Sequence, residues 1–207
     1  MLFKMFNKIC FLTIISFVSG CSVQEIQKNE DYGQLNNHFE RENASFVQWN
    51  EDYAVTVKHA KFIRNSTYKS KTYDVQFFKK KSILVPTWTN PVKHEELSMT
   101  GFVLYKNSTE TVKYGKDFGR AIAFNQDNYR IVNTKIVKGM SGGPVFNKTK
   151  QVVGINVGYT LRKQLIENKK LDISVYVPYS IIKEEWNKFE QEKNNINKLE
   201  IPLTKLN

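Results

Sequence analysis

Short runs of β-branched and aromatic residues, separated by turns rich in Gly, Asn and Asp, make up most of the chain. Apolar and polar positions alternate over residues 53–57, as they do in a half-buried strand. Strands are predicted over residues 45–49, 53–57 and 73–78 in the first half, and over residues 101–105, 111–114, 120–124, 129–132, 144–146, 151–155 and 172–178 in the second. Short strands at this spacing indicate an all-β barrel or sandwich.

One helix is predicted near the C-terminus. Ser180 is a favourable N-cap residue, and four apolar residues after it fall on one helical face: Ile181, Ile182, Trp186 and Phe189. A turn is predicted at residues 115–117, with Asp117 as a turn former, and residues 160–170 are expected to form a polar, lysine-rich loop.

The N-terminus has the pattern of a secretory signal. Lys4 and Lys8 precede the apolar residues 11–18, a run that is too short to span a bilayer as a helix. Residues 22–44 are polar and aperiodic, which is typical of a flexible tether. The predicted organisation is a signal peptide over residues 1–20, a tether over residues 21–44, one folded domain over residues 45–192 and a C-terminal tail over residues 193–207.

Composition and charge narrow the function classes. The 207 residues carry a net charge of +11, and subtracting the two lysines of the leader leaves +9 on the rest of the chain. This charge suits a surface beside anionic lipid headgroups. Residues 79–81 form one short lysine run without interleaved aromatic residues, so no nucleic-acid partner is expected. No His, Cys and acidic residues have the spacing of metal ligands, so neither a metal nor another cofactor is expected.

Residues 138–145, Lys-Gly-Met-Ser-Gly-Gly-Pro-Val, place a serine among glycines. Glycine at positions 139 and 142 permits turn conformations that a side chain forbids. Such a turn aims the amides of Gly139 and Ser141 at one point, where they stabilise a developing oxyanion. The motif therefore suits nucleophilic attack on a carbonyl by the Ser141 hydroxyl.

This motif and the residues after it resemble the chymotrypsin-like (trypsin-fold) serine proteases. G-x-S-G-G-P is followed by Val145-Phe146 and then by Val-Val-Gly-Ile, and the text up to Gly158 is most similar to the bacterial glutamyl endopeptidases and the high-temperature-requirement type. The resemblance implies an all-β fold of two six-stranded antiparallel Greek-key barrels, the first of them either complete or trimmed, with a C-terminal helix. It also implies a protein or peptide substrate, Ser141 as the nucleophile, and the amides of Gly139 and Ser141 as the oxyanion hole.

The same resemblance identifies His59 as the general base. Residues 55–60, Val-Thr-Val-Lys-His-Ala, match the sequence motif V-T-A-A-H that ends a strand in this family, with lysine in place of the second alanine. In the family this histidine accepts the proton of the serine hydroxyl.

Asp74 is the candidate for the acidic member of the triad, because the text around it resembles a strand start of the family. However, only 15 residues separate it from His59, where the family usually fits two strands. At about 3.3 Å per residue, this length holds little more than one short hairpin. Either the first barrel is trimmed and Asp74 orients the imidazole, or residues 73–78 are an earlier strand. In the second case the acid position falls at residues 82–85, which include no carboxylate.

The resemblance also predicts a substrate pocket built from two segments. Lys135 and Ile136 are expected to form one wall, whereas Asn156, Val157 and Gly158 match the strand that pairs with substrate in this family. Asn156 stands where glutamyl endopeptidases carry a histidine that recognises glutamate, which argues against acidic specificity. Ile136 favours an aliphatic substrate side chain, and Lys135 favours an acidic one.

Val-Ser-Gly-Cys over residues 18–21 resembles the lipobox of bacterial lipoproteins. In that family, cleavage before the cysteine leaves a new N-terminus that is acylated, with palmitate among the attached lipids, here at Cys21. Because Cys10 would leave with the leader, no disulfide is expected. Ser22 in place of aspartate implies an outer-membrane destination in a Gram-negative host.

These features predict a monomeric, lipid-anchored serine endopeptidase of the bacterial cell envelope that acts through Ser141, His59 and Asp74. The short interval between His59 and Asp74 motivates a second hypothesis, in which a pseudoprotease serves as a lipid-tethered binding module without turnover. An esterase with the same triad is a third hypothesis, because the nucleophile itself does not distinguish an ester from an amide.

Overall fold

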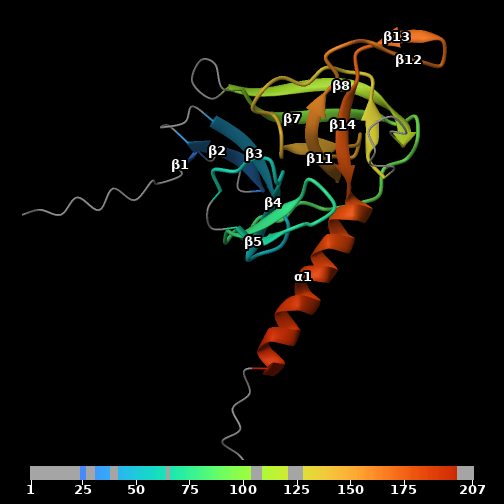
Figure 1. Ribbon diagram of the computed structural model, residues 1–207. Coiled ribbons are helices and arrows are strands. Elements are labelled where there is room, and N and C mark those ends of the chain that lie inside the picture. Colours follow the sequence, from blue (N-terminus) through green and yellow to red (C-terminus); the bar gives the residue numbers. More distant parts are fainter. Residues whose placement is uncertain are drawn as a thin grey trace, which may run out of the picture.

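The computed structural model describes residues 24–26, 31–37, 42–63, 66–103, 109–120 and 128–199. The leader, Cys21 and most of the strand predicted at residues 120–124 lie outside these ranges. Figure 1 shows the described elements: β1 (Gln24–Ile26), β2 (Tyr32–Asn37), β3 (Glu42–Gln48), β4 (Tyr53–Thr56), β5 (Ser66–Lys69), β6 (Gln76–Lys79), β7 (Glu96–Val103), β8 (Thr109–Arg120), β9 (Arg130–Val132), β10 (Pro144–Phe146), β11 (Val152–Tyr159), β12 (Gln164–Ile166), β13 (Lys169–Leu171), β14 (Ser174–Pro178) and α1 (Tyr179–Leu199).

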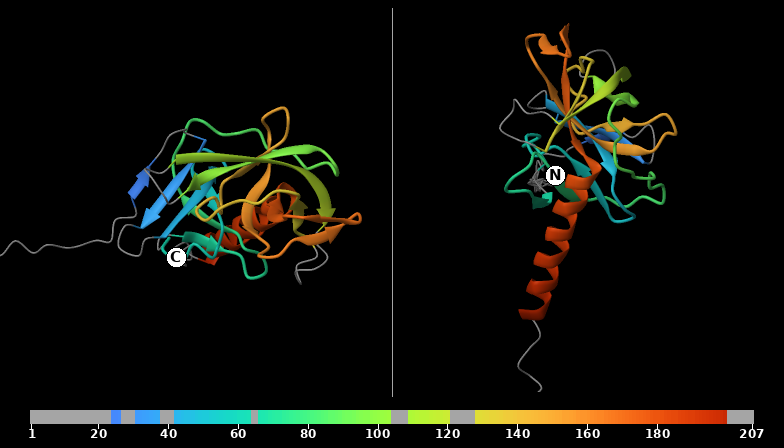
Figure 2. Two further views of the ribbon diagram at one scale, coloured as in Figure 1. Left: turned by 90° about the horizontal axis from the view of Figure 1, so that it is seen from above. Right: turned by 90° about the vertical axis from the view of Figure 1, so that its right-hand side faces the viewer.

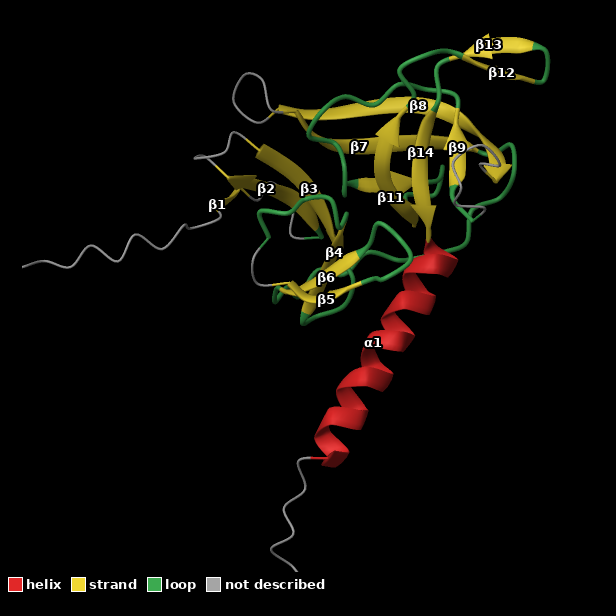
Figure 3. Ribbon diagram, in the orientation of Figure 1, coloured by secondary structure: helices red, strands yellow, loops and turns green. Residues whose placement is uncertain are grey.

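The strands form two large antiparallel sheets (Figure 3). The second half of the chain builds a closed six-stranded barrel in the order β10-β11-β14-β9-β8-β7. The first half builds a six-stranded sheet in the order β1-β2-β3-β4-β6-β5. This sheet is open, since within the described residues β1 pairs only with β2 and β5 only with β6. The all-β prediction with a trimmed first barrel and a C-terminal helix is thus confirmed.

One apolar core joins the two units. Phe46, Val55 and Phe77 of the first sheet belong to the same cluster of buried side chains as Ile155 and Val177 of the barrel. A second cluster fills the inside of the barrel: Leu97, Met99, Val132, Ile136, Met140, Val145, Val153 and Tyr176. Because removing apolar area from water is the main favourable term in folding, the shared cluster holds the two units as one body.

Helix α1 leaves the barrel directly after β14 and packs on the first sheet (Figures 1 and 2). The ring of Trp186 lies 5.1 Å from the rings of Tyr53 and Phe77, and Phe189 lies 5.5 Å from Tyr53. The predicted apolar face is confirmed, although Ser180 lies in the first turn because the helix begins at Tyr179. Among the described residues, no helix is long and apolar enough to cross a bilayer.

Two predicted boundaries are wrong. The tail predicted from residue 193 continues as helix to Leu199, because residues 190–199 contain neither Gly nor Pro to end it. The predicted tether over residues 21–44 contains β1, β2 and the start of β3. Gln34 and Asn36 of β2 are buried, so polar residues occupy interior positions there and hide the apolar pattern.

Two local predictions in the second half are also wrong. The turn predicted at residues 115–117 is part of the continuous strand β8, which bends through an irregular register between Asp117 and Gly119. The loop predicted at residues 160–170 contains β12 and the start of β13, which form a two-stranded hairpin. Neither strand shows apolar alternation, because both faces of the hairpin are largely exposed.

Candidate active site

The loop between β9 and β10 carries Ser141, and two glycines shape it. Gly139 and Gly142 have φ angles of 101° and 85°, a region that side chains rarely adopt. A Cβ at Gly139 would also collide with the carbonyl of Phe102, and one at Gly142 with the carbonyl of Ser45. Both glycines are therefore required by conformation and by space.

Ser45 of β3 fastens this loop to the first sheet. Its amide donates a hydrogen bond to the Ser141 carbonyl at 2.7 Å, and its hydroxyl donates to the Gly139 carbonyl at 3.0 Å. The Ser45 hydroxyl also accepts a hydrogen bond from the Phe102 amide at 3.0 Å. This role of Ser45 cannot be predicted from the sequence, because a serine that is buried inside a strand is indistinguishable there from any other serine of a strand.

The amides of Gly139 and Ser141, on either side of Met140, have no acceptor among the described residues. Among the described residues, the Met140 amide donates to Val137 and the Gly142 amide to Asn156, whereas the amides of Gly139 and Ser141 donate to no protein group. Buried or half-buried amides without partners cost free energy, so such a pair is notable in a native fold. These are the two donors that the motif predicts for an oxyanion hole.

His59 and Asp74 lie together in the structure. The Nδ1 atom of His59 lies 2.5 Å from Asp74 Oδ2, and the His59 amide donates to Asp74 Oδ1 at 2.8 Å. The side chain of Asp74 is 17% exposed and that of His59 is 50% exposed. With the carboxylate on Nδ1, the proton of a neutral imidazole is held there, and Nε2 is left as the acceptor.

Short connections explain how an interval of 15 residues places the carboxylate beside the imidazole. The residues described between His59 and Asp74 include a four-residue strand, β5, which pairs directly with β6. Asp74 lies two residues before β6, and β6 pairs with β4, the strand that leads to His59. In the structure, the short first unit brings the Asp74 carboxylate to the imidazole of His59.

A buried glutamine holds the turn that carries His59. Gln76 Nε2 donates to the carbonyl of Val57 at 2.7 Å and to that of Ala60 at 3.2 Å, so it spans both sides of His59. Gln76 begins β6 immediately after the Asp74 segment. Residues 74–76 thus supply the carboxylate of Asp74 and also hold the backbone on both sides of His59.

The barrel supports the other side of Asp74. The Asp74 amide donates to the hydroxyl of Tyr129 at 2.7 Å, and Asn128 donates to the hydroxyl of Tyr73 at 2.8 Å. Burial raises the pKa of Tyr129 to about 12, so this phenol stays protonated at neutral pH. Residues 73 and 74 are therefore tied to the segment before β9, across the boundary between the two units.

Gly142, the residue after Ser141, lies against the end of β4, but Ser141 is not hydrogen bonded to His59 in the described residues. A Cβ on Gly142 would collide with Thr56 Oγ1, three residues before His59, which shows how closely the nucleophile loop approaches this strand. The Ser141 hydroxyl donates to the carbonyl of Val157 at 2.8 Å. Within the described residues, no hydrogen bond joins Ser141 to His59.

The predicted pocket residues separate into exposed and buried groups. Lys135 is exposed, with its Nζ atom 5.1 Å from the centroid of the Tyr159 ring. Val157 and Gly158 are half-buried on β11, where the register shifts between Asn156 and Gly158. These three predicted residues remain accessible to a ligand.

Ile136 and Asn156, by contrast, are not accessible to a ligand. Ile136 is buried in the barrel core, so it cannot line an open pocket floor. Asn156 is fully buried, and its Nδ2 atom donates to the carbonyls of Thr100 at 2.8 Å and Met140 at 3.2 Å. The expectation that Asn156 contacts substrate is therefore wrong, because its side chain joins the nucleophile loop to β7.

Asp117 is a buried ion-pair partner and not the turn former that we expected. It is fully buried and accepts hydrogen bonds from Arg130 Nε at 2.9 Å and Nη2 at 2.6 Å. The hydroxyl of Tyr176 donates to Asp117 Oδ2 at 2.6 Å. Burial, followed by the Asp117 charge, raises the pKa of Tyr176. This cluster joins β8, β9 and β14.

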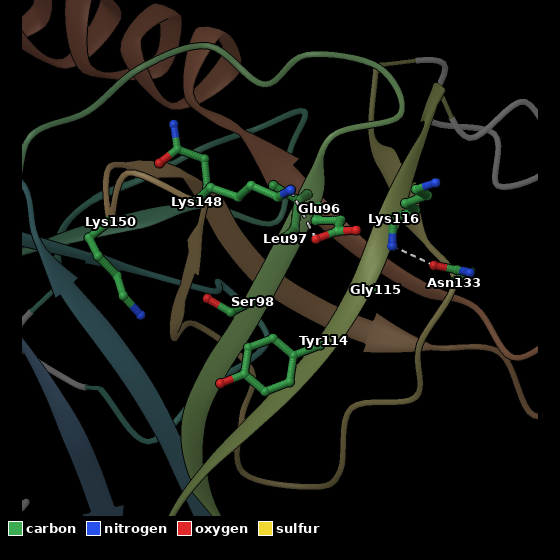
Figure 4. A pocket seen from close by; sticks show the side chains of 10 residues that line it. Glu96, Leu97, Ser98, Tyr114, Gly115, Lys116, Asn133, Lys148 and Lys150 are labelled. Atoms are coloured by element: carbon green, nitrogen blue, oxygen red, sulfur yellow. Dashed lines mark hydrogen bonds and ion pairs between the residues drawn. The ribbon is translucent and has the colours of Figure 1, made fainter.

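A groove lies elsewhere, on the outside of the barrel (Figure 4). It has a volume of about 510 Å³ and is lined by β7, β8 and the turn after β10, with Glu96 paired to Lys148 at 3.2 Å. None of its lining residues belongs to the group around Ser141, His59 and Asp74. Volume alone therefore does not mark the candidate site in this fold.

Comparisons with known proteins identify the fold. Searches of protein-family models and of curated proteins found no match. Among solved structures, the inactive form of a serine-to-alanine mutant of Rv3671c from M. tuberculosis H37Rv aligns with a TM-score of 0.59 and 9% sequence identity. The alignment covers 78% of this chain and 87% of that chain.

Rv3671c has a trypsin-like serine protease fold, and at this identity the likeness concerns the fold alone. The present chain accordingly has the trypsin-like fold of two β units and a C-terminal helix.

Proposed function

We propose that this protein is a serine endopeptidase that hydrolyses peptide bonds through an acyl-enzyme intermediate. The observation that carries the proposal is the contact of Asp74 with His59 at two points, the ring Nδ1 and the backbone amide, beside the loop of Ser141. A carboxylate on Nδ1 leaves Nε2 free to accept a proton from a nucleophile. The trypsin-like fold supports the same chemistry by analogy.

Each group has one role in the proposed reaction. Ser141 Oγ attacks the scissile carbonyl and forms a C–O bond, while His59 Nε2 takes the hydroxyl proton. Asp74 stabilises the resulting imidazolium. The amides of Gly139 and Ser141 donate to the oxyanion of the tetrahedral intermediate, and the loss of one such donor typically costs about 3 kcal/mol in the barrier. His59 then returns the proton to the leaving amine, and water resolves the acyl-enzyme by the reverse sequence.

A peptide library tests this function directly. The purified chain should cleave a subset of peptides, and Ser141→Ala should abolish cleavage while retaining the fold, because the alanine methyl group fits where the hydroxymethyl group lies. Substrate contacts are proposed for Lys135, Val157 and Gly158, so the cleavage profile would also decide between acidic and aliphatic specificity. A library left intact by the folded protein, or cleaved equally by Ser141→Ala, would contradict the proposal.

A binding module without turnover is the second candidate. The observation that favours it is the hydrogen bond from the Ser141 hydroxyl to the Val157 carbonyl, which leaves His59 without a bond to the nucleophile. Under the first proposal, bound substrate redirects this hydroxyl to His59; under the second, the bond persists. Peptides that bind at the site with measurable affinity and are never cleaved would favour the binding module.

We also propose that the protein is a bacterial envelope lipoprotein acylated at Cys21, with an outer-membrane destination in a Gram-negative host. The lipobox-like text of residues 18–21 supports this proposal. Cells grown with an alkyne-tagged fatty acid should incorporate the tag into the wild-type chain and not into Cys21→Ser. Equal incorporation in both chains, or none in either, would contradict acylation at Cys21.

A further inference from the structure

Three consecutive aliphatic side chains are exposed in the segment between β6 and β7. Ile83 is 88% exposed, Leu84 50% and Val85 39%. Isolated apolar residues are ordinary on protein surfaces, but an exposed run of three is uncommon unless it has a binding role. We call residues 83–85 the aliphatic tip.

The aliphatic tip is part of an ordered loop. The Ser82 hydroxyl accepts a hydrogen bond from the Leu84 amide at 3.1 Å, and the Ser82 amide donates to the Glu51 carbonyl at 3.0 Å. Beyond the tip, the Thr89 amide donates to the Val152 carbonyl at 2.9 Å. The backbone is therefore fixed on both sides of the tip, which presents the aliphatic groups to solvent at little further entropic cost on binding.

A basic run precedes the aliphatic tip. Residues 79–81 are three lysines, and the neighbouring turn between β3 and β4 supplies two acidic groups, Glu51 and Asp52. Lys79 and Lys81 are exposed. Positive charge therefore exceeds negative charge around the tip. Near an anionic bilayer, each lysine strengthens attraction roughly fivefold.

We propose that residues 79–85 bind anionic phospholipid bilayers, with the aliphatic tip at the boundary between headgroups and acyl chains. Aliphatic groups beside lysines match this boundary, which offers hydrocarbon next to negative charge. A hydrophobic groove on another protein would accept the tip but has no general need for the adjoining lysines. The contact is separate from the lipid proposed at Cys21 and rests on neither the lipid nor catalysis.

A fluorescent label at the tip tests the proposal in the full chain. Cys10→Ser and Cys21→Ser remove the native thiols, and Leu84→Cys provides one site for the environment-sensitive dye NBD. The matched control carries the label at Leu161→Cys, since Leu161 is 89% exposed and lies after β11. Because both chains keep the same leader, any attachment through the leader affects them equally, and the difference between the labels isolates the tip.

On vesicles with equal parts of phosphatidylcholine and phosphatidylglycerol, the label at position 84 should shift to shorter wavelength and be quenched by a nitroxide on the lipid acyl chain. The label at position 161 should do neither. Adding Lys79→Gln and Lys81→Gln should weaken the anionic-vesicle response of the tip label by roughly fivefold per lysine. Pure phosphatidylcholine should give a smaller response.

Two results would overturn the proposal. The first is no response at position 84, or equal responses at positions 84 and 161. The second is a blue shift at position 84 that occurs without vesicles and grows with protein concentration, which would show that the tip binds a second copy of the chain. Matching melting temperatures for the two labelled chains would establish that both are folded.

Discussion

Replacing Asp74 with asparagine changes one atom and reverses the hydrogen-bond pattern at His59. Asp74 uses both oxygens, Oδ2 on the ring Nδ1 atom at 2.5 Å and Oδ1 on the His59 amide at 2.8 Å. Asparagine has one oxygen, which can remain on the backbone amide. Its NH₂ group then faces Nδ1, so Nδ1 must accept and the imidazole proton moves to Nε2, where it blocks proton abstraction from Ser141.

The magnitude follows from this change of tautomer. Where an asparagine replaces the acid of such a triad, kcat falls by about 10⁴. At 1.36 kcal/mol per factor of ten, this fall corresponds to about 5 kcal/mol in the activation barrier. We expect kcat of Asp74→Asn to fall by this amount on a cleaved library peptide while KM changes little, because Asp74 faces the imidazole and not the proposed substrate strand.

Asp52→Asn is the matched control, since Asp52 is an exposed acid in the turn between β3 and β4 and, within the described residues, forms no hydrogen bond or ion pair with His59. It should leave kcat unchanged. Thermal unfolding of both variants separates a lost fold from lost chemistry. If folded Asp74→Asn kept kcat within tenfold of the wild type, the claim that Asp74 orients the imidazole would be refuted.

The remaining predictions concern stability. Gly142→Ala should destabilise the chain by about 2 kcal/mol or more in urea unfolding, because φ is 85° and the methyl group would collide with the first sheet; wild-type stability would contradict the loop geometry. Arg130→Met should cost about 3–5 kcal/mol because it leaves Asp117 buried without its ion pair, and adding Asp117→Asn should recover part of that loss. Burial by itself raises the pKa of Glu185, but hydrogen bonds, that of Lys188 foremost, outweigh it and lower the pKa below the ordinary value of 4.5. The stability that the carboxylate contributes is therefore present above pH 4.5 and is lost as pH falls through the folded-state pKa. Urea titrations at descending pH should show a shallower decline for Glu185→Gln than for the wild type; identical slopes would contradict this linkage.

The sequence was most informative where backbone conformation dictates residue type. Glycine at positions 139 and 142 is required by positive φ and by close packing, so the nucleophile loop can be predicted from the sequence. The apolar face of α1 could be predicted for a similar reason, since Trp186 and Phe189 bury their rings against each other. In both places one local rule decides the residue.

Prediction failed where polar residues are buried by tertiary partners. Gln34, Asn156 and Asp117 are all buried, and nothing local distinguishes them from exposed residues of the same type. Asn156 was predicted to line a pocket because its position in the sequence matched a specificity residue of the glutamyl endopeptidases. Its side-chain amide instead donates hydrogen bonds to the carbonyls of Thr100 and Met140. Hydrogen bonds between remote segments determine these positions, and only the folded structure shows them.

The measurement that tests the central claim most directly is the site of reaction with a fluorophosphonate probe, read by mass spectrometry of the digested chain. The account predicts one adduct on the peptide that contains Ser141, absent from Ser141→Ala and strongly reduced in folded His59→Ala. No adduct on the folded wild-type chain, or an adduct on Ser141 that forms equally fast without His59, would contradict it.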